Sequence, residues 1–157
     1  MSQNPYTPPE TDVRVPDDGP PRPVRGVILA FVFDLVGTII AVSIISIIYT
    51  VILANQGLSE SEIEQILLSE DLSSMYGVIT TLVGLGFSYY SGQICIRVSR
   101  GKTLSYAYVL AGINVIFGLM VAFSTTNVGV MLALTALSVG AVLLGAQHAL
   151  KKNVGAA

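Results

Sequence analysis

Residues 27–54 read VILAFVFDLVGTIIAVSIISIIYTVILA, an apolar run interrupted by one charged residue, Asp34. A transmembrane helix needs about 20 consecutive apolar residues, whereas the apolar region of a secretory signal has only about 7–15. No A-x-A cleavage site follows the run. The stretch therefore predicts a retained transmembrane helix over residues 26–54. At ~1.5 Å per residue the helix is longer than a ~30 Å hydrocarbon core, so it should tilt or protrude.

Three further apolar stretches, at residues 74–96, 104–123 and 128–150, have the length of a membrane span. Hydrophobic residues make up 52% of the chain and charged residues 11%. An average soluble domain has about 25% charged residues, so the composition excludes one. It predicts an all-α fold, an integral membrane bundle of four transmembrane helices that occupies residues 26–150. Because two of the connections are short, consecutive helices should be antiparallel neighbours.

Basic residues occur only before the first span, between the second and third spans, and after the fourth. They are Arg14, Arg22, Arg25, Arg97, Arg100, Lys102, Lys151 and Lys152. Because cytoplasmic loops carry an excess of Lys and Arg, both termini should be cytoplasmic, in a protein of the cell inner (cytoplasmic) membrane. We also expect membrane lipid as a partner, with anionic headgroups contacting the basic side chains between the second and third spans, which are Arg97, Arg100 and Lys102.

The two terminal segments should lie outside the bundle. Residues 1–25 contain all seven prolines of the chain, and a Pro-rich polar stretch cannot form a packed core. This composition predicts a disordered cytoplasmic tail. Residues 151–157 form a second, shorter cytoplasmic tail.

The loop at residues 55–73 holds five acidic residues and no Lys or Arg, which predicts an extracytoplasmic position. Ser59 and Glu62 have the spacing of a capping box at the start of a helix. An apolar face follows, made by Ile63, Ile66 and Leu67. The loop should therefore contain a short amphipathic helix.

Asp34 is the only acidic residue inside a predicted span, and it falls near the middle of the bilayer. Burying an ionised carboxylate there costs several kcal/mol, so Asp34 should face the bundle and be protonated or have a partner. The strongest polar candidates nearby are Thr38, Gln93 and Asn114. Asp34 is either a proton or cation site or a hydrogen-bonded residue that fixes helix register. A proton relay usually has further ionisable residues at depth, and the spans contain none.

Small residues recur every four positions on two of the predicted spans, and this spacing lets another helix backbone approach closely. In the second span the stripe consists of Thr80, Gly84, Ser88 and Gly92. In the fourth span it consists of Ala141, Gly145 and Ala149. We expect both stripes at helix–helix contacts, and a neighbouring face of the fourth span carries Ala136 and Gly140.

The sequence lacks the patterns of most enzymes and nucleic-acid-binding proteins. A single Cys95 and a single His148 form no cluster with metal-ligand spacing, so we expect no metal and no cofactor. No basic domain face is present for nucleic acid. No acid, base and nucleophile converge outside the membrane, and we therefore expect no enzymatic activity.

The segment Ser91-Gly92-Gln93-Ile94-Cys95-Ile96-Arg97 resembles a motif, G-G-x-x-A-x-R, that ends the second helix in small four-helix bacterial membrane proteins of unknown function. The resemblance extends over residues 91–118. Ser91 replaces the first Gly, Cys95 replaces the Ala, and Tyr106 stands where that family has His. The resemblance implies a compact bundle of four transmembrane helices and brings no known activity.

Two functions remain open. We expect a non-enzymatic multi-pass membrane protein, a structural or accessory subunit that packs with itself as a homo-oligomer or with another membrane protein. The alternative is a minimal proton- or cation-coupled carrier or channel that uses Asp34. A water-filled path that reaches Asp34 would favour transport, and a dry core with Asp34 bonded to Asn114 would favour the structural function.

Overall fold

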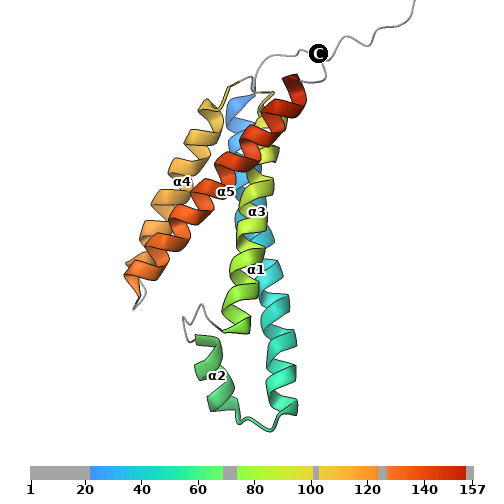
Figure 1. The fold of residues 1–157 in the computed structure, drawn as a ribbon, viewed down its shortest axis with the longest axis vertical. Coiled ribbons are helices and arrows are strands. Elements are labelled where there is room, and N and C mark those ends of the chain that lie inside the picture. The colour runs from blue at the N-terminus through green and yellow to red at the C-terminus, as the bar shows by residue number, and fades with distance from the viewer. Residues whose placement is uncertain (1–21, 69–73, 101–102, 124–126, 155–157) are drawn as a thin grey trace, which may run out of the picture.

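The computed structural model describes residues 22–68, 74–100, 103–123 and 127–154. These residues form five helices and no strand, which confirms the all-α prediction (Figure 1). The helices are α1 (Pro23–Asn55), α2 (Glu60–Leu68), α3 (Met75–Ser99), α4 (Ser105–Ala122) and α5 (Val128–Val154). The expected disordered tail falls mostly outside the described residues, and so do the end of the C-terminal tail and Lys102.

Three of the described helices, α1, α4 and α5, are long and apolar enough to cross a membrane. The membrane character of the chain is thereby confirmed for three of the four predicted spans. With 25 residues, α3 is also long, but it is not among them. Its hydroxyl-bearing residues and glycines lower its mean hydropathy, so a fourth span stays a prediction.

The four long helices pack around α3 and α5. α3 packs most extensively against α5 and α1, and α4 packs mainly against α5. Figure 1 shows that α4 and α5 lean away from α1 and α3 toward the end at which α2 lies. At that end α1 continues beyond α3, and α2 packs beside it.

The buried core lies where the helices are close together, near the ends of α1, α3 and α5 that carry Lys and Arg. One cluster consists of Val27, Ala30, Cys95, Leu110 and Val142, and the other of Ile96, Ala107, Ala146 and Ala149. Alanine supplies three of the four residues of the second cluster and allows close packing of the backbones there. The start of α1 is also held to the end of α3, because the Arg22 N–H donates to the Ser99 carbonyl at 3.1 Å. Pro23, which has no N–H to donate, occupies the first turn of α1, where the fixed φ of proline is favourable.

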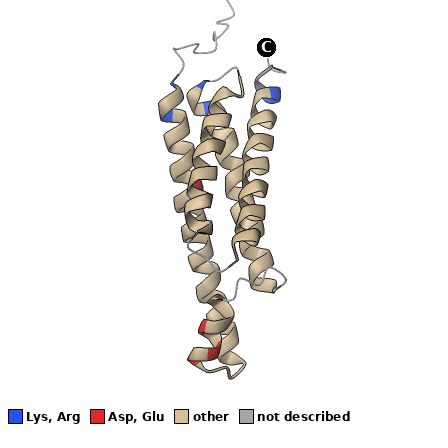
Figure 2. Ribbon diagram, turned by 90° about the vertical axis from the view of Figure 1, so that its left-hand side faces the viewer, with Lys and Arg blue, Asp and Glu red and all other residues tan. Residues whose placement is uncertain are grey.

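Charges are separated along the long axis of the molecule. Figure 2 shows the described Lys and Arg residues at one end and the acidic residues of α2 at the other. The first group comes from the start of α1 and the ends of α3 and α5. The structure contains no membrane, so which end faces the cytoplasm stays a prediction.

The start of α2 has half of the predicted capping box. The Ser59 N–H donates to the Glu62 carboxylate at 2.8 Å, as expected for this motif. The Ser59 hydroxyl, however, donates to the same carboxylate at 2.6 Å. These two hydrogen bonds, the hydroxyl first, lower the pKa of Glu62 below its ordinary value of 4.5.

Candidate functional site

Asp34 of α1 is buried, with only 8% of its surface exposed, and its carboxylate accepts hydrogen bonds from two other helices. From α3, the Ser88 hydroxyl lies 3.1 and 3.2 Å from the two carboxylate oxygens, and the Ser91 hydroxyl lies 3.4 Å from Oδ2. From α4, the Asn114 amide donates to Oδ2 at 3.1 Å. The hydrogen bond between Asp34 and Asn114 that the sequence predicted is therefore present.

The fourth long helix joins this cluster through a serine. Ser138 of α5 lies 2.8 Å from the Ser88 hydroxyl oxygen. We call Asp34, Ser88, Ser91, Asn114 and Ser138 the Asp34 cluster. All the hydrogen-bonding partners of the Asp34 carboxylate are neutral, so nothing in the cluster compensates a negative charge.

Gln93, the other predicted partner, does not contact Asp34. Its side-chain oxygen accepts a hydrogen bond from Arg97 Nη2 at 3.2 Å. Successive helical residues are about 100° apart, so Gln93 lies on the side of α3 opposite Ser91. Ser91 and Ser138 were not among the predicted site residues, and Ser88 was predicted only at a helix contact. The available signal was the spacing of Ser88 and Ser91, which places two hydroxyls on one helical face.

A cavity of about 670 Å³ reaches the Asp34 cluster from the side of α2. All five helices contribute to its lining, and most of its walls are apolar. Hydroxyl and amide groups are distributed along it, from Thr38, Thr80, Thr81, Ser88, Asn114, Thr135 and Ser138. Thr38, which the sequence placed beside Asp34, thus lines the cavity one turn away on α1. Leu67 and Leu68 bring α2 into the lining.

The predicted packing stripe of α3 is divided between this cavity and a helix contact. Thr80, Gly84 and Ser88 line the cavity. A Cβ at Gly84 would meet only one neighbouring atom within 4 Å, Thr38 Cγ2 at 3.9 Å. Only Gly92 makes the close backbone approach expected for all four. The prediction of one continuous contact is therefore corrected, because α4 and α5 lean away from α3 at the α2 end.

The contact at Gly92 is a crossing of α3 and α5 with a glycine on each helix. A Cβ at Gly92 would overlap the Val142 carbonyl oxygen, and a Cβ at Gly145 would overlap the Tyr89 carbonyl oxygen. Of the other residues in the stripe of α5, Ala149 is fully buried and Ala141 is partly buried. This crossing closes the bundle at the end that carries Lys and Arg.

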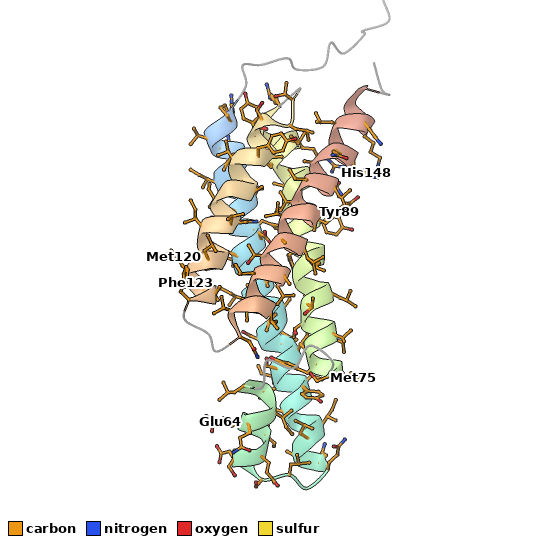
Figure 3. The ribbon with its side chains drawn as sticks, turned by 60° about the vertical axis from the view of Figure 1, so that its left-hand side comes forward. Glu64, Met75, Tyr89, Met120, Phe123 and His148 are labelled. Atoms are coloured by element: carbon orange, nitrogen blue, oxygen red, sulfur yellow. The ribbon has the colours of Figure 1, made fainter. Side chains whose placement is uncertain are left out.

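The predicted headgroup residues lie at that closed end. Arg97 is exposed in the last turn of α3, and Arg100 follows the helix with a left-handed φ of 52°. His148 lies beside Tyr89, with the ring centroids 6.3 Å apart in an edge-to-face arrangement (Figure 3). Arg97 and His148 are therefore surface groups of the closed end and do not reach the cavity.

Within the described residues, no group of three or more His, Cys, Asp and Glu side chains is placed to hold a metal ion. Comparison with protein-family models, with curated proteins and with solved structures found no match. The family resemblance of residues 91–118 therefore stays a prediction. The site itself is a carboxylate with neutral donors at the inner end of a cavity.

Proposed function

We propose that this chain is a non-enzymatic carrier of four transmembrane spans that binds a proton or a small cation at Asp34. One observation supports it above the others, namely the cavity that reaches a buried carboxylate whose partners are all neutral. The sequence left two functions open and distinguished them by such a path. Asp34 is also bonded to Asn114, as the structural function required, but the core around it is not closed.

The fourth span of the proposal is α3. Its low hydropathy has a local explanation, since several of its hydroxyl-bearing residues face the interior of the bundle. Ser88 donates to Asp34, Ser91 lies 3.4 Å from the same carboxylate while it donates to the Ser88 carbonyl, and Thr80 and Thr81 line the cavity. Polar side chains in a transmembrane helix are expected on such an interior face. In this topology both termini are on the cytoplasmic side and α2 is extracytoplasmic, in agreement with the charge distribution.

The geometry suggests how the carrier operates. The cavity extends from the α2 side to Asp34, and the crossing at Gly92 and Gly145 closes the opposite side. A cation entering from the α2 side would meet the carboxylate, whose charge it neutralises. Binding thereby removes the cost of an uncompensated charge at this depth. Release on the other side requires α3 and α5 to separate at their crossing.

The proposal is tested with the purified full chain in liposomes that contain a trapped pH-sensitive dye. A potassium diffusion potential should drive proton entry faster than in protein-free liposomes. Asp34→Asn keeps the size of the side chain and removes titration, so this variant should retain the wild-type melting temperature and lose the flux. Wild-type liposomes that are no more permeable than protein-free liposomes, for protons and for sodium ions, would refute the carrier.

A different observation favours the second candidate, an accessory subunit that packs with itself or with another membrane protein. On α5, Ala136 is exposed, and a Cβ at Gly129 or Gly140 would meet nothing within 4 Å. This small-residue face is open to a further helix. If it is an interface between copies, the wild-type protein should sediment as an oligomer in mild detergent and Gly140→Leu should sediment as a monomer. A wild-type monomer that co-purifies with no other membrane protein would exclude this candidate.

A further inference from the structure

The size of the cavity exceeds what a proton or a bare metal ion requires. Its volume of about 670 Å³ is within the roughly 300–1,000 Å³ typical of sites for small organic molecules. One water occupies about 30 Å³ in the liquid. Much of the wall consists of aliphatic side chains from all five helices, among them Leu35, Leu67, Leu85, Val121 and Leu134. Such walls fit a ligand with an apolar body.

The charge at the inner end of the cavity indicates the polar part of that ligand. Among the described residues, Asp34 is the only acidic or basic side chain in the lining. When Asp34 is ionised, its neutral donors satisfy its hydrogen bonds and leave its net charge uncompensated. A cation would supply the opposite charge, an anion would be repelled, and a neutral ligand would leave the charge as it is.

Aromatic rings beside Asp34 favour the same sign of charge. Phe31 lies three residues before Asp34 on α1, and Phe117 lies three residues after Asn114 on α4. Both rings line the cavity, with their centroids 6.2 Å apart in an edge-to-face arrangement. The face of an aromatic ring attracts a cation, most strongly in a site shielded from water.

Acidic side chains lie on α2, the helix that lines the part of the cavity remote from Asp34. α2, which contributes Leu67 and Leu68 to the lining, also carries Glu60, Glu62 and Glu64, and all three are exposed. Figure 3 shows Glu64 on α2, at the end of the molecule opposite His148. Charge of one sign at this end of the molecule raises the local concentration of ions of the other sign.

We infer that the cavity binds a monovalent organic cation, an ammonium group on an apolar body, with the ammonium at Asp34 on the cavity side of the Phe31 and Phe117 rings. The inference rests on the proposed function, since it names the ligand of the same site. It combines four features of the structure: the volume of the cavity, its apolar walls, the Asp34 carboxylate without an opposite charge beside it, and the aromatic rings in the lining.

The test is equilibrium dialysis with the full chain in mild detergent, measured against protein-free micelles. The probe is dansylcadaverine, whose pentyl chain ends in an ammonium. Its neutral counterpart is N-pentyl dansylamide, which has the same body and ends in a methyl group. We expect saturable binding of the amine, and binding at least about tenfold weaker for the neutral counterpart and for the amine on Asp34→Asn, because a buried charge pair is lost in each case.

A second pair of variants tests the cavity with Asp34 intact. Gly84 lines the cavity, so the side chain of Gly84→Leu should occupy it and abolish binding of the amine. Gly86→Leu is the matched control on α3, because Gly86 does not line the cavity and a Cβ there would meet nothing within 4 Å. This control should bind the amine as the wild-type protein does.

Binding of the amine that is no stronger than that of the neutral counterpart, or that survives Gly84→Leu, would overturn the inference. Its failure is distinguishable from failure of the proposed function. Proton or sodium flux that depends on Asp34, together with no preference for the amine, would refute the ligand class alone. Binding of the amine that depends on Asp34, with no flux, would refute the carrier and leave the ligand site.

Discussion

At the crossing of α3 and α5, the structure predicts how one added methyl group on a glycine changes the free energy of unfolding. A Cβ at Gly92 would overlap the Val142 carbonyl oxygen and would lie 2.9 Å from the Val142 carbonyl carbon and 3.0 Å from the Ala146 nitrogen. Carbon atoms in contact are about 3.5–4.0 Å apart, so the helices would have to separate by on the order of 1 Å. The overlapped atoms belong to the backbone and cannot rotate away.

The free energy of unfolding should therefore fall in Gly92→Ala and in Gly145→Ala. Overpacking of a close contact costs about 1–3 kcal/mol, and the higher helix propensity of alanine offsets up to about 1 kcal/mol of that cost. Because the overlapped atoms are backbone, the cost should lie at the upper end of that range, and the expected net loss is about 2 kcal/mol for each variant. At Gly140 a Cβ would meet nothing within 4 Å, so Gly140→Ala should gain up to about 1 kcal/mol from propensity alone.

Unfolding of these variants can be followed through a native cysteine. Cys95 is the only cysteine and is fully buried beside the crossing, so a thiol-reactive dye should label it only when the bundle opens. Thermal unfolding in mild detergent should give a lower melting temperature for both crossing variants and a higher one for Gly140→Ala. The double variant should lose less than the sum, because the helices are already apart. Equal stabilisation by alanine at Gly92, Gly145 and Gly140 would show that the helices do not approach closely.

Three further predictions concern the buried carboxylate, the start of α2 and the topology. Asp34→Leu leaves the surrounding donors unpaired and should cost about 1–3 kcal/mol relative to Asp34→Asn, measured by the same dye, and equal stability would contradict the hydrogen-bonded cluster. The pKa of Glu62, followed by NMR at its carboxyl carbon, should lie below 4.5, and it should rise in Ser59→Ala. The stability that this cap adds is present above the pKa of the unfolded state and is lost as pH falls through the pKa of the folded state. A cysteine introduced at exposed Gln65 should react with an impermeant thiol reagent from outside intact cells and one at exposed Lys152 should not, and the opposite labelling would reverse the orientation.

The hydrophobic pattern by itself was sufficient to predict the helices. The spans expected at residues 26–54, 74–96, 104–123 and 128–150 correspond to α1, α3, α4 and α5, whose ends differ from them by a few residues. Long apolar runs with polar residues at their ends leave few alternatives, because a backbone in lipid has to satisfy its own hydrogen bonds. The bond between Asp34 and Asn114 was also predictable, since Asn114 is the only amide side chain near the middle of a predicted span.

Only the tertiary structure decided what each helical face contacts. The spacing of Thr80, Gly84, Ser88 and Gly92 places them on one face of α3, but spacing contains no information about the angle at which α5 crosses that face. Because α4 and α5 lean away from α3, Gly92 packs against a backbone, whereas Thr80 and Gly84 face a cavity. The serines that bond to Asp34 and Ser88 were likewise decided by the packing of helices that are distant in sequence, which no local pattern specifies.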